Sequence, residues 1–267
     1  MRLLTPIIPD PGAPLGRANP VAKLGAALVI LVALFASLDG VTAGLVLVAL
    51  VALLPVSGLS ARALLGRAWP AGVAAVSIGV FNVLFAGEQL GPTAVDYGPL
   101  RIGADTLVNG AGLALRLVAI VLAGLLATAT SDPVDIADAL VQQLRVSPRF
   151  AIGVLAALRL LPLLAREWQI LGMARRARGV EAGRSPIAAI RLFAGRLLSL
   201  LVGAIRRGSR MALAMEARGF GASPCRSVAR PQRMRISDWG WIIGAVALAA
   251  GAVATSLALG TWRPLLG

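Results

Sequence analysis

The feature that most constrains this chain is a series of long apolar segments with almost no charged residues. Residues 239–259 contain none, and residues 106–129 contain only Arg116. Shorter apolar runs cover residues 21–38, 41–56 and 71–85. A bilayer core is crossed by about 20 apolar residues in a helix, which satisfies its own backbone hydrogen bonds. We therefore predict an all-α integral membrane protein with about five transmembrane helices.

Composition supports this fold class and excludes several kinds of active site. Hydrophobic residues make up 58% of the 267 residues and charged residues 14%, which is too little polar surface for a globule in water. The chain has no histidine and one cysteine, Cys225, so a His-ligated metal site, a Ser/His/Asp triad and an internal disulfide are excluded.

The charges outside the apolar runs predict the orientation in the membrane. We expect the first 20 residues, rich in Pro and Gly, to form no regular element, and residues 21–38 to be a retained span rather than a cleaved signal peptide. Residues 57–69, with Arg62 and Arg67, fit a cytoplasmic connection, whereas residues 87–105 are net acidic and fit an external loop. This places the N-terminus inside.

An arginine within a span is costly. We expect Arg116 either to face a protein or water-filled interior, or to extend toward a membrane interface.

Residues 130–237 differ from ordinary spans. They hold 18 of the 26 Lys and Arg residues and six acidic ones, which predicts a cytoplasmic location. Three dipeptides in which a capping residue precedes proline mark helix starts: Asp132-Pro133, Ser147-Pro148 and Ser185-Pro186. The helices after them mix Arg with Leu, Ile and Met, so we expect long amphipathic helices rather than spans. Aromatic platforms for nucleic acid are missing, and no nucleic-acid partner is expected.

These observations divide the chain into three parts. Residues 1–129 hold the N-terminal transmembrane helices, residues 130–237 form a cytoplasmic or interfacial domain, and residues 238–267 hold the last transmembrane helix.

Two identical tripeptides end the two long helices expected in residues 130–237: Ala177-Arg178-Gly179 and Ala217-Arg218-Gly219. An Arg in the last turn followed by Gly is an ordinary helix stop, so one tripeptide carries little information. Their shared context favours a function. Alanine is small enough for another backbone to approach, and the planar arginine guanidinium can donate two hydrogen bonds to a carboxylate. Glycine gives the helix end the conformational freedom to fit a groove. Two equivalent tips fit a partner that is itself a dimer.

With these motifs the chain resembles the T component of energy-coupling factor (ECF) transporters, the vitamin and trace-metal importers of prokaryotes. Three other stretches share the resemblance: residues 15–24, residues 128–140, and Leu158-Arg159-Leu160-Leu161-Pro162 followed by Glu167. Their order and spacing extend the resemblance over nearly the whole chain.

The resemblance implies a coupling subunit in the prokaryotic cell (inner) membrane. It would join two P-loop ATPases to a small membrane-embedded substrate-binding subunit, the S component, for vitamin or cobalt uptake. Six residues would dock the ATPases: Ala177, Arg178, Gly179, Ala217, Arg218 and Gly219. Arg159, Pro162 and Glu167 would pack the coupling domain. This chain would be a non-enzymatic subunit that binds no metal and no cofactor itself. The partners would bind ATP, because this chain has no Gly-x-x-x-x-Gly-Lys-Ser/Thr loop.

Three other interpretations stay open on sequence alone. A conventional ABC permease domain would have about six spans and a single coupling helix. A membrane enzyme is weakly indicated by residues 39–44, Asp-Gly-Val-Thr-Ala-Gly, which partly match a phospholipid alcohol-transferase signature but lack its downstream carboxylates. A non-catalytic scaffold would only anchor a partner.

Overall fold

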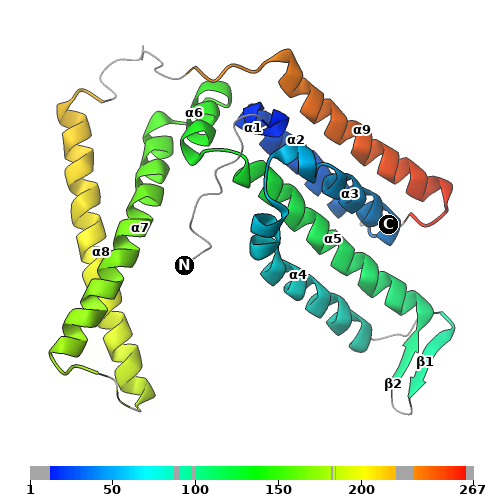
Figure 1. The fold of residues 1–267 in the computed structure, drawn as a ribbon, viewed down its shortest axis with the longest axis horizontal. Helices are drawn as coiled ribbons and strands as arrows, with labels where there is room; N and C mark the ends of the chain where they lie inside the picture. Colours follow the sequence, from blue (N-terminus) through cyan, green and yellow to red (C-terminus); the bar gives the residue numbers. More distant parts are fainter. Residues whose placement is uncertain are drawn as a thin grey trace. The chain divides into compact units, whose positions relative to one another are not determined.

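The computed structural model describes residues 13–86, 91–97, 100–181, 183, 185–220 and 231–262, and most of them are helical (Figure 1). The α-helices are α1 (Pro14–Arg17), α2 (Pro20–Ala36), α3 (Gly40–Ala52), α4 (Ala61–Leu84), α5 (Ala104–Ala129), α6 (Pro133–Gln143), α7 (Pro148–Ala177), α8 (Pro186–Ala217) and α9 (Ile236–Ala258). A 3-10 helix, η2 (Leu54–Ser57), follows α3.

Packing divides the chain into two compact units. The first comprises Met1–Gln143 and Gln232–Gly267, and the second is Leu144–Pro231. We call them the bundle unit and the hairpin unit. The three-part division of the sequence stays a prediction about topology. By packing, however, α6 belongs to the bundle unit, because it contacts α2.

Five helices in the described part of the chain are long and apolar enough to cross a membrane: α4, α5, α7, α8 and α9. The prediction of an all-α membrane protein with about five such helices is confirmed, but the set differs. The predicted first two spans form α2 and α3, which have only 17 and 13 residues, or about 25 and 20 Å of helix. The turn around Asp39 separates α2 from α3, and η2 with Pro55 follows α3. Conversely, α7 and α8 qualify by length and composition, although their arginines had suggested poor spans.

One local expectation is wrong. Residues 14–17, placed in an irregular N-terminal stretch, form the short helix α1 with Pro14 at its first position, where proline is well tolerated. The loop expected to be external contains a hairpin of β1 (Thr93–Tyr97) and β2 (Leu100–Gly103), paired antiparallel. Its Thr, Val, Tyr, Leu and Ile residues favour strands.

Three predicted helix starts are confirmed. Helices α6, α7 and α8 begin at Pro133, Pro148 and Pro186. Asp132 Oδ1 accepts from Val134 N at 2.8 Å before α6, and Ser185 Oγ accepts from Ala188 N at 3.3 Å before α8. These side chains satisfy backbone donors that a helix leaves free at its N-terminus.

Helix α5 is the centre of the bundle unit and packs on α2, α3 and α4. Glycines allow the close approach. A Cβ added at Gly112 would lie 2.9 Å from the Cα of Gly40 in α3, and a Cβ added at Gly79 of α4 would lie 2.8 Å from the carbonyl oxygen of Gly110. Small residues are how helices approach one another in lipid. The Gly- and Ala-rich composition thus serves backbone contact.

Arg116 lies in the interior of the bundle unit and does not extend to an interface. Its side chain is buried, and its Nη2 donates to the carbonyl oxygen of Ser37, at the end of α2. Asp39, also buried, accepts from Ser37 Oγ, and from Thr42 N and Oγ1 at 2.8 Å each. Thr42 Oγ1 in turn lies 3.5 Å from the carbonyl oxygen of Ala252 in α9. This polar cluster joins four helices.

The chain leaves and re-enters the bundle unit at one hydrogen-bonded point. Gln143 Nε2 donates to the carbonyl oxygen of Gln232 at 3.0 Å, and Gln232 N donates to Gln142 Oε1 at 2.8 Å. Gln232 Nε2 also donates to Asp135 Oδ1 at 3.3 Å. The end of α6 and the segment before α9 are therefore held side by side.

Glycine packing at α5 gives a direct stability test. We expect Gly112→Ala to destabilise the bundle unit by about 1–3 kcal/mol, because the new methyl group meets the α3 backbone. Gly124→Ala on the same helix is the matched control, because its new Cβ meets no atom within 4 Å. The higher helix propensity of alanine should then stabilise the bundle unit by up to about 1 kcal/mol. Thermal unfolding of the detergent-solubilised protein measures both, and equal melting temperatures would contradict the close α3–α5 contact.

Candidate functional site

The hairpin unit consists of α7 and α8, which run antiparallel and cross (Figure 1). Near the α7–α8 turn, Arg175 Nη1 donates to the carbonyl oxygen of Leu192 at 2.8 Å. The Trp168 ring meets Phe193 edge-on at 5.2 Å between centroids, and the Arg196 guanidinium lies 5.9 Å from the Trp168 ring centre. Arginine and aromatic side chains therefore hold this end of the two helices together.

Two glycines make room for these arginines. A Cβ at Gly172 would lie 3.3 Å from Arg196 Nη1, and a Cβ at Gly195 would lie 3.2 Å from Arg175 Nη2. Each guanidinium therefore crosses the facing helix where that helix has no side chain.

The two Ala-Arg-Gly tripeptides have the same geometry. Arg178 and Arg218 are the C-caps of α7 and α8, and Gly179 and Gly219 follow with φ of 71° and 74°. After α7, Gly179 N donates to the oxygen of Arg176 at 2.9 Å and Val180 N to that of Arg175 at 3.0 Å.

The same pair of bonds closes α8. Gly219 N donates to the oxygen of Glu216 at 2.9 Å, and Phe220 N to that of Met215 at 3.0 Å. This is the Schellman arrangement, which needs the left-handed conformation that glycine adopts without strain. All six motif residues are exposed.

The tips lie at opposite ends of the hairpin unit. Arg178 lies at the turn between the helices, whereas α8 ends beside the start of α7, where Met215, Glu216 and Phe220 share a groove with Arg149 and Ile152. Helix α7 has 30 residues, so about 45 Å separates the two tips. The structure therefore presents two matching arginine tips, far apart, on one pair of helices.

The three residues expected to pack this domain have different surroundings. Glu167 forms an ion pair with Arg207 across the α7–α8 contact, and both are about one-third exposed. Arg159 and Pro162 lie within α7 with exposed side chains. Trp168, Arg175 and Arg196 join the two helices but were not predicted to do so. An aromatic residue and arginines within otherwise apolar helices are visible in the sequence, but the sequence does not show which residues they contact.

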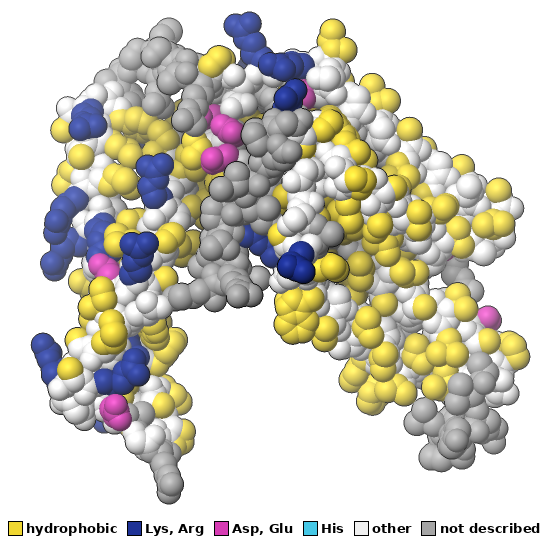
Figure 2. Space-filling model, viewed as in Figure 1, with side chains coloured by type: hydrophobic (Ala, Val, Ile, Leu, Met, Phe, Trp, Pro, Cys, Tyr) yellow, Lys and Arg dark blue, Asp and Glu magenta, His cyan; other side chains and the backbone are white. Residues whose placement is uncertain are grey.

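The hairpin unit exposes many large apolar side chains. Ile187 and Ile190 of α8 are 70% and 69% exposed, and no residue of α8 is buried. Figure 2 shows arginine side chains, in dark blue, spread over this unit among hydrophobic ones. Beside the second tip, a groove of about 400 Å³ has Gly153, Ala156 and Gly208 among its lining residues. Such an apolar surface needs lipid or another protein to cover it.

Comparison with known proteins gives consistent matches. The family described as "CbiQ: Cobalt transport protein" matches residues 12–227. The chain is 31% identical over 168 residues to "Energy-coupling factor transporter transmembrane protein EcfT 1" of Listeria monocytogenes, covering 60% of each protein. It is 29% identical to EcfT of Bacillus subtilis, covering 60% of this chain and 63% of that protein. These two matches span about three fifths of the relatives' length. A third match, to EcfT of Thermosediminibacter oceani, is 26% identical and covers 89% of this chain and 91% of that protein.

The glycine of each tip can be tested by backbone exchange. We expect Gly179→Ala or Gly219→Ala to speed amide exchange at Val180 or Phe220 by roughly fivefold or more, since a left-handed residue with a Cβ costs about 1–2 kcal/mol. Gly203→Ala, inside α8 with no atom within 4 Å of the new Cβ, should not do so. Hydrogen–deuterium exchange with mass spectrometry measures the effect, and unchanged exchange in both tip variants would contradict the capping geometry.

Proposed function

The chain belongs to the cobalt transport protein family, and on this premise we propose that it is the transmembrane coupling subunit of an ECF-type ATP-driven importer. It transmits ATPase movement to an S component that takes up a vitamin or trace metal such as cobalt. The relatives named as energy-coupling factor transporter transmembrane proteins support this assignment. The chain itself is not catalytic, and ATP binds to partner ATPases.

The pair of equivalent arginine tips is the observation that carries the proposal. Arg178 and Arg218 are exposed, lie at matching helix ends, and are about 45 Å apart. A dimeric partner with one acidic groove per subunit would engage both at once, each guanidinium forming a two-pronged bond to a carboxylate. This fits two P-loop ATPases, one for each tip.

The geometry of the hairpin unit supports transmission of movement. Its two helices are joined by side-chain contacts: Arg175 to Leu192, Trp168 to Phe193 and Arg196, and Glu167 to Arg207. When the ATPases close on ATP, the two tips would be drawn together and the helices would shift along these contacts. The exposed apolar side chains of α8, such as Ile187 and Ile190, would pass the shift to the S component.

This role requires a defined orientation. We propose that the protein lies in the prokaryotic cell (inner) membrane with its N-terminus and hairpin unit facing the cytoplasm, where ATP is available. The excess of Lys and Arg in residues 130–237 supports that side.

Charge reversal at the tips tests the proposal. We expect Arg178→Glu or Arg218→Glu to weaken ATPase binding by about 2–5 kcal/mol, because a charged group in the interface loses its partner. The double variant should lose the ATPases entirely, since neither tip then holds the dimer. Co-purification in mild detergent, with partners quantified by mass spectrometry, measures the loss.

Arg206→Glu is the matched control, because Arg206 is exposed in α8 but away from both tips. It makes the same charge change and should retain the ATPases. Full ATPase recovery with the double tip variant, or equal loss with the control, would overturn the docking role. Unchanged melting temperatures show that the variants are folded.

A further inference from the structure

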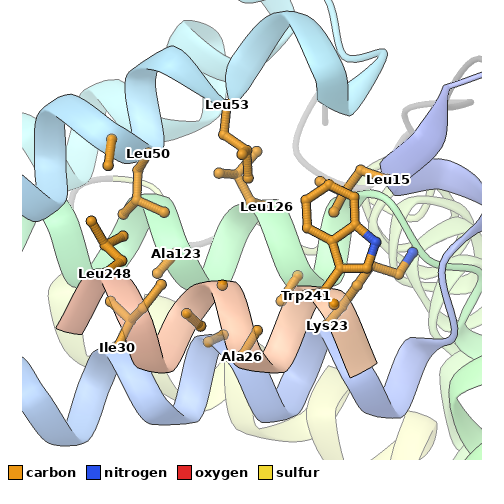
Figure 3. A pocket seen from close by; sticks show the side chains of 16 residues that line it. Leu15, Lys23, Ala26, Ile30, Leu50, Leu53, Ala123, Leu126, Trp241 and Leu248 are labelled. Atoms are coloured by element: carbon orange, nitrogen blue, oxygen red, sulfur yellow. The ribbon is translucent and has the colours of Figure 1, made fainter. Parts of the chain in front are cut away.

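The bundle unit contains a cavity with one charged end and one apolar end, and the proposed coupling function does not use it. Its volume is about 310 Å³, and α2, α3, α5 and α9 all line it (Figure 3). Lys23 and Trp241 lie at one end, whereas Ile30, Leu50 and Leu248 lie at the other (Figure 3). The cavity is therefore polarised along its length.

Small residues in the wall leave this space open. Gly240 and Gly244 of α9 line the cavity, and a Cβ added to either meets no atom within 4 Å. Ala26 and Ala49 line it from α2 and α3. An apolar cavity of about 150 Å³ already binds benzene, and this one is roughly twice as large. Its chemistry and size suit a hydrocarbon chain.

The charged end has unused binding capacity. Lys23 is 4% exposed, and its Nζ donates to Thr130 O at 2.9 Å and Thr130 Oγ1 at 3.3 Å. Within the described part of the chain these are its acceptors, which leaves one of its three hydrogens. The Trp241 side chain lies beside it, as is typical where hydrocarbon meets lipid headgroups.

The acidic residues near Lys23 already have other partners. Asp135 and Asp238 interact with Lys23 electrostatically. Asp238 Oδ1 accepts from Asn19 N at 2.9 Å and Oδ2 from Arg235 N at 2.7 Å, and Asp135 Oδ1 accepts from Gln232 Nε2 at 3.3 Å. These carboxylates stabilise the surrounding backbone and side chains, so Lys23 remains the cationic group that faces the cavity.

We propose that this cavity binds one acyl chain of an anionic phospholipid from the bilayer. The phosphate lies at Lys23 and Trp241, and the chain extends toward Leu50 and Leu248. A single cation and no anion among the lining residues favours a negative headgroup over a zwitterionic one. Helices α5 and α9, which form two walls, are long and apolar enough to lie in a bilayer. The inference does not depend on the ATPase-docking role.

The test uses the full chain, extracted with its partners and reconstituted in nanodiscs with a photoreactive lipid. The probe is phosphatidylglycerol or phosphatidylcholine with a diazirine at the end of one acyl chain, and labelled peptides are identified by mass spectrometry. We expect the phosphatidylglycerol probe to label peptides containing Leu50 and Leu248. Lys23→Gln should lower that labelling about fivefold, to the phosphatidylcholine level, because one Lys–lipid attraction is lost.

Two glycine variants of α9 provide the decisive comparison. Gly244→Leu fills the cavity and should abolish the labelling. Gly251→Leu also adds a side chain where no atom lies within 4 Å of the new Cβ, but outside the cavity, and should retain it. Equal labelling of these two variants, or equal labelling of the unaltered chain by both lipids, would overturn the proposal. The glycine pair and the two-lipid comparison decide the outcome even where Lys23→Gln fails to fold.

Discussion

The buried Arg116 guanidinium is the group around which the bundle unit is organised. A charge in hydrocarbon is tolerated only when protein groups replace its water. Here the carbonyl oxygen of Ser37 accepts a hydrogen bond from it, and the negative charge of the neighbouring Asp39 carboxylate attracts it. The turn between α2 and α3 therefore lies inside the bundle. At this point α2, α3, α5 and α9 converge.

The proposed lipid cavity lies away from this cluster, in the same four helices. The cluster draws on the end of α2, the start of α3, Arg116 of α5 and Ala252 of α9. The cavity is lined by residues 23–30 of α2, the last turns of α3, residues 123–127 of α5 and residues 240–248 of α9. Polar contacts and small residues hold the four helices close together at the cluster. Beyond the cluster the helices are spaced more widely, which leaves room for a hydrocarbon chain.

The two units bury their surfaces by different physical means. In the bundle unit, glycines bring backbones together, and the resulting contacts enclose residues such as Leu34 and Val46 completely. In the hairpin unit, arginine and aromatic side chains join α7 to α8 at a few points, and no residue of α8 is buried. A unit that exposes so much apolar surface is complete only when covered. Its dependence on partners or lipid is therefore a property of its packing, and it agrees with a subunit that works within a larger assembly.

The sequence by itself determined the class of protein, three helix starts and the family, because these depend on local patterns: apolar length, capping residues before proline, and paired Ala-Arg-Gly ends. The family resemblance drawn from those motifs is confirmed. The tertiary structure decided where Arg116 lies, because its guanidinium donates to the carbonyl oxygen of Ser37, 79 positions away in the chain. It also decided that both tips share one geometry at opposite ends of a hairpin. It decided as well that Lys23, which the sequence placed in an apolar run and in the family-like residues 15–24, faces a cavity. These features require residues from distant segments to meet, and helical periodicity carries no information about which faces do.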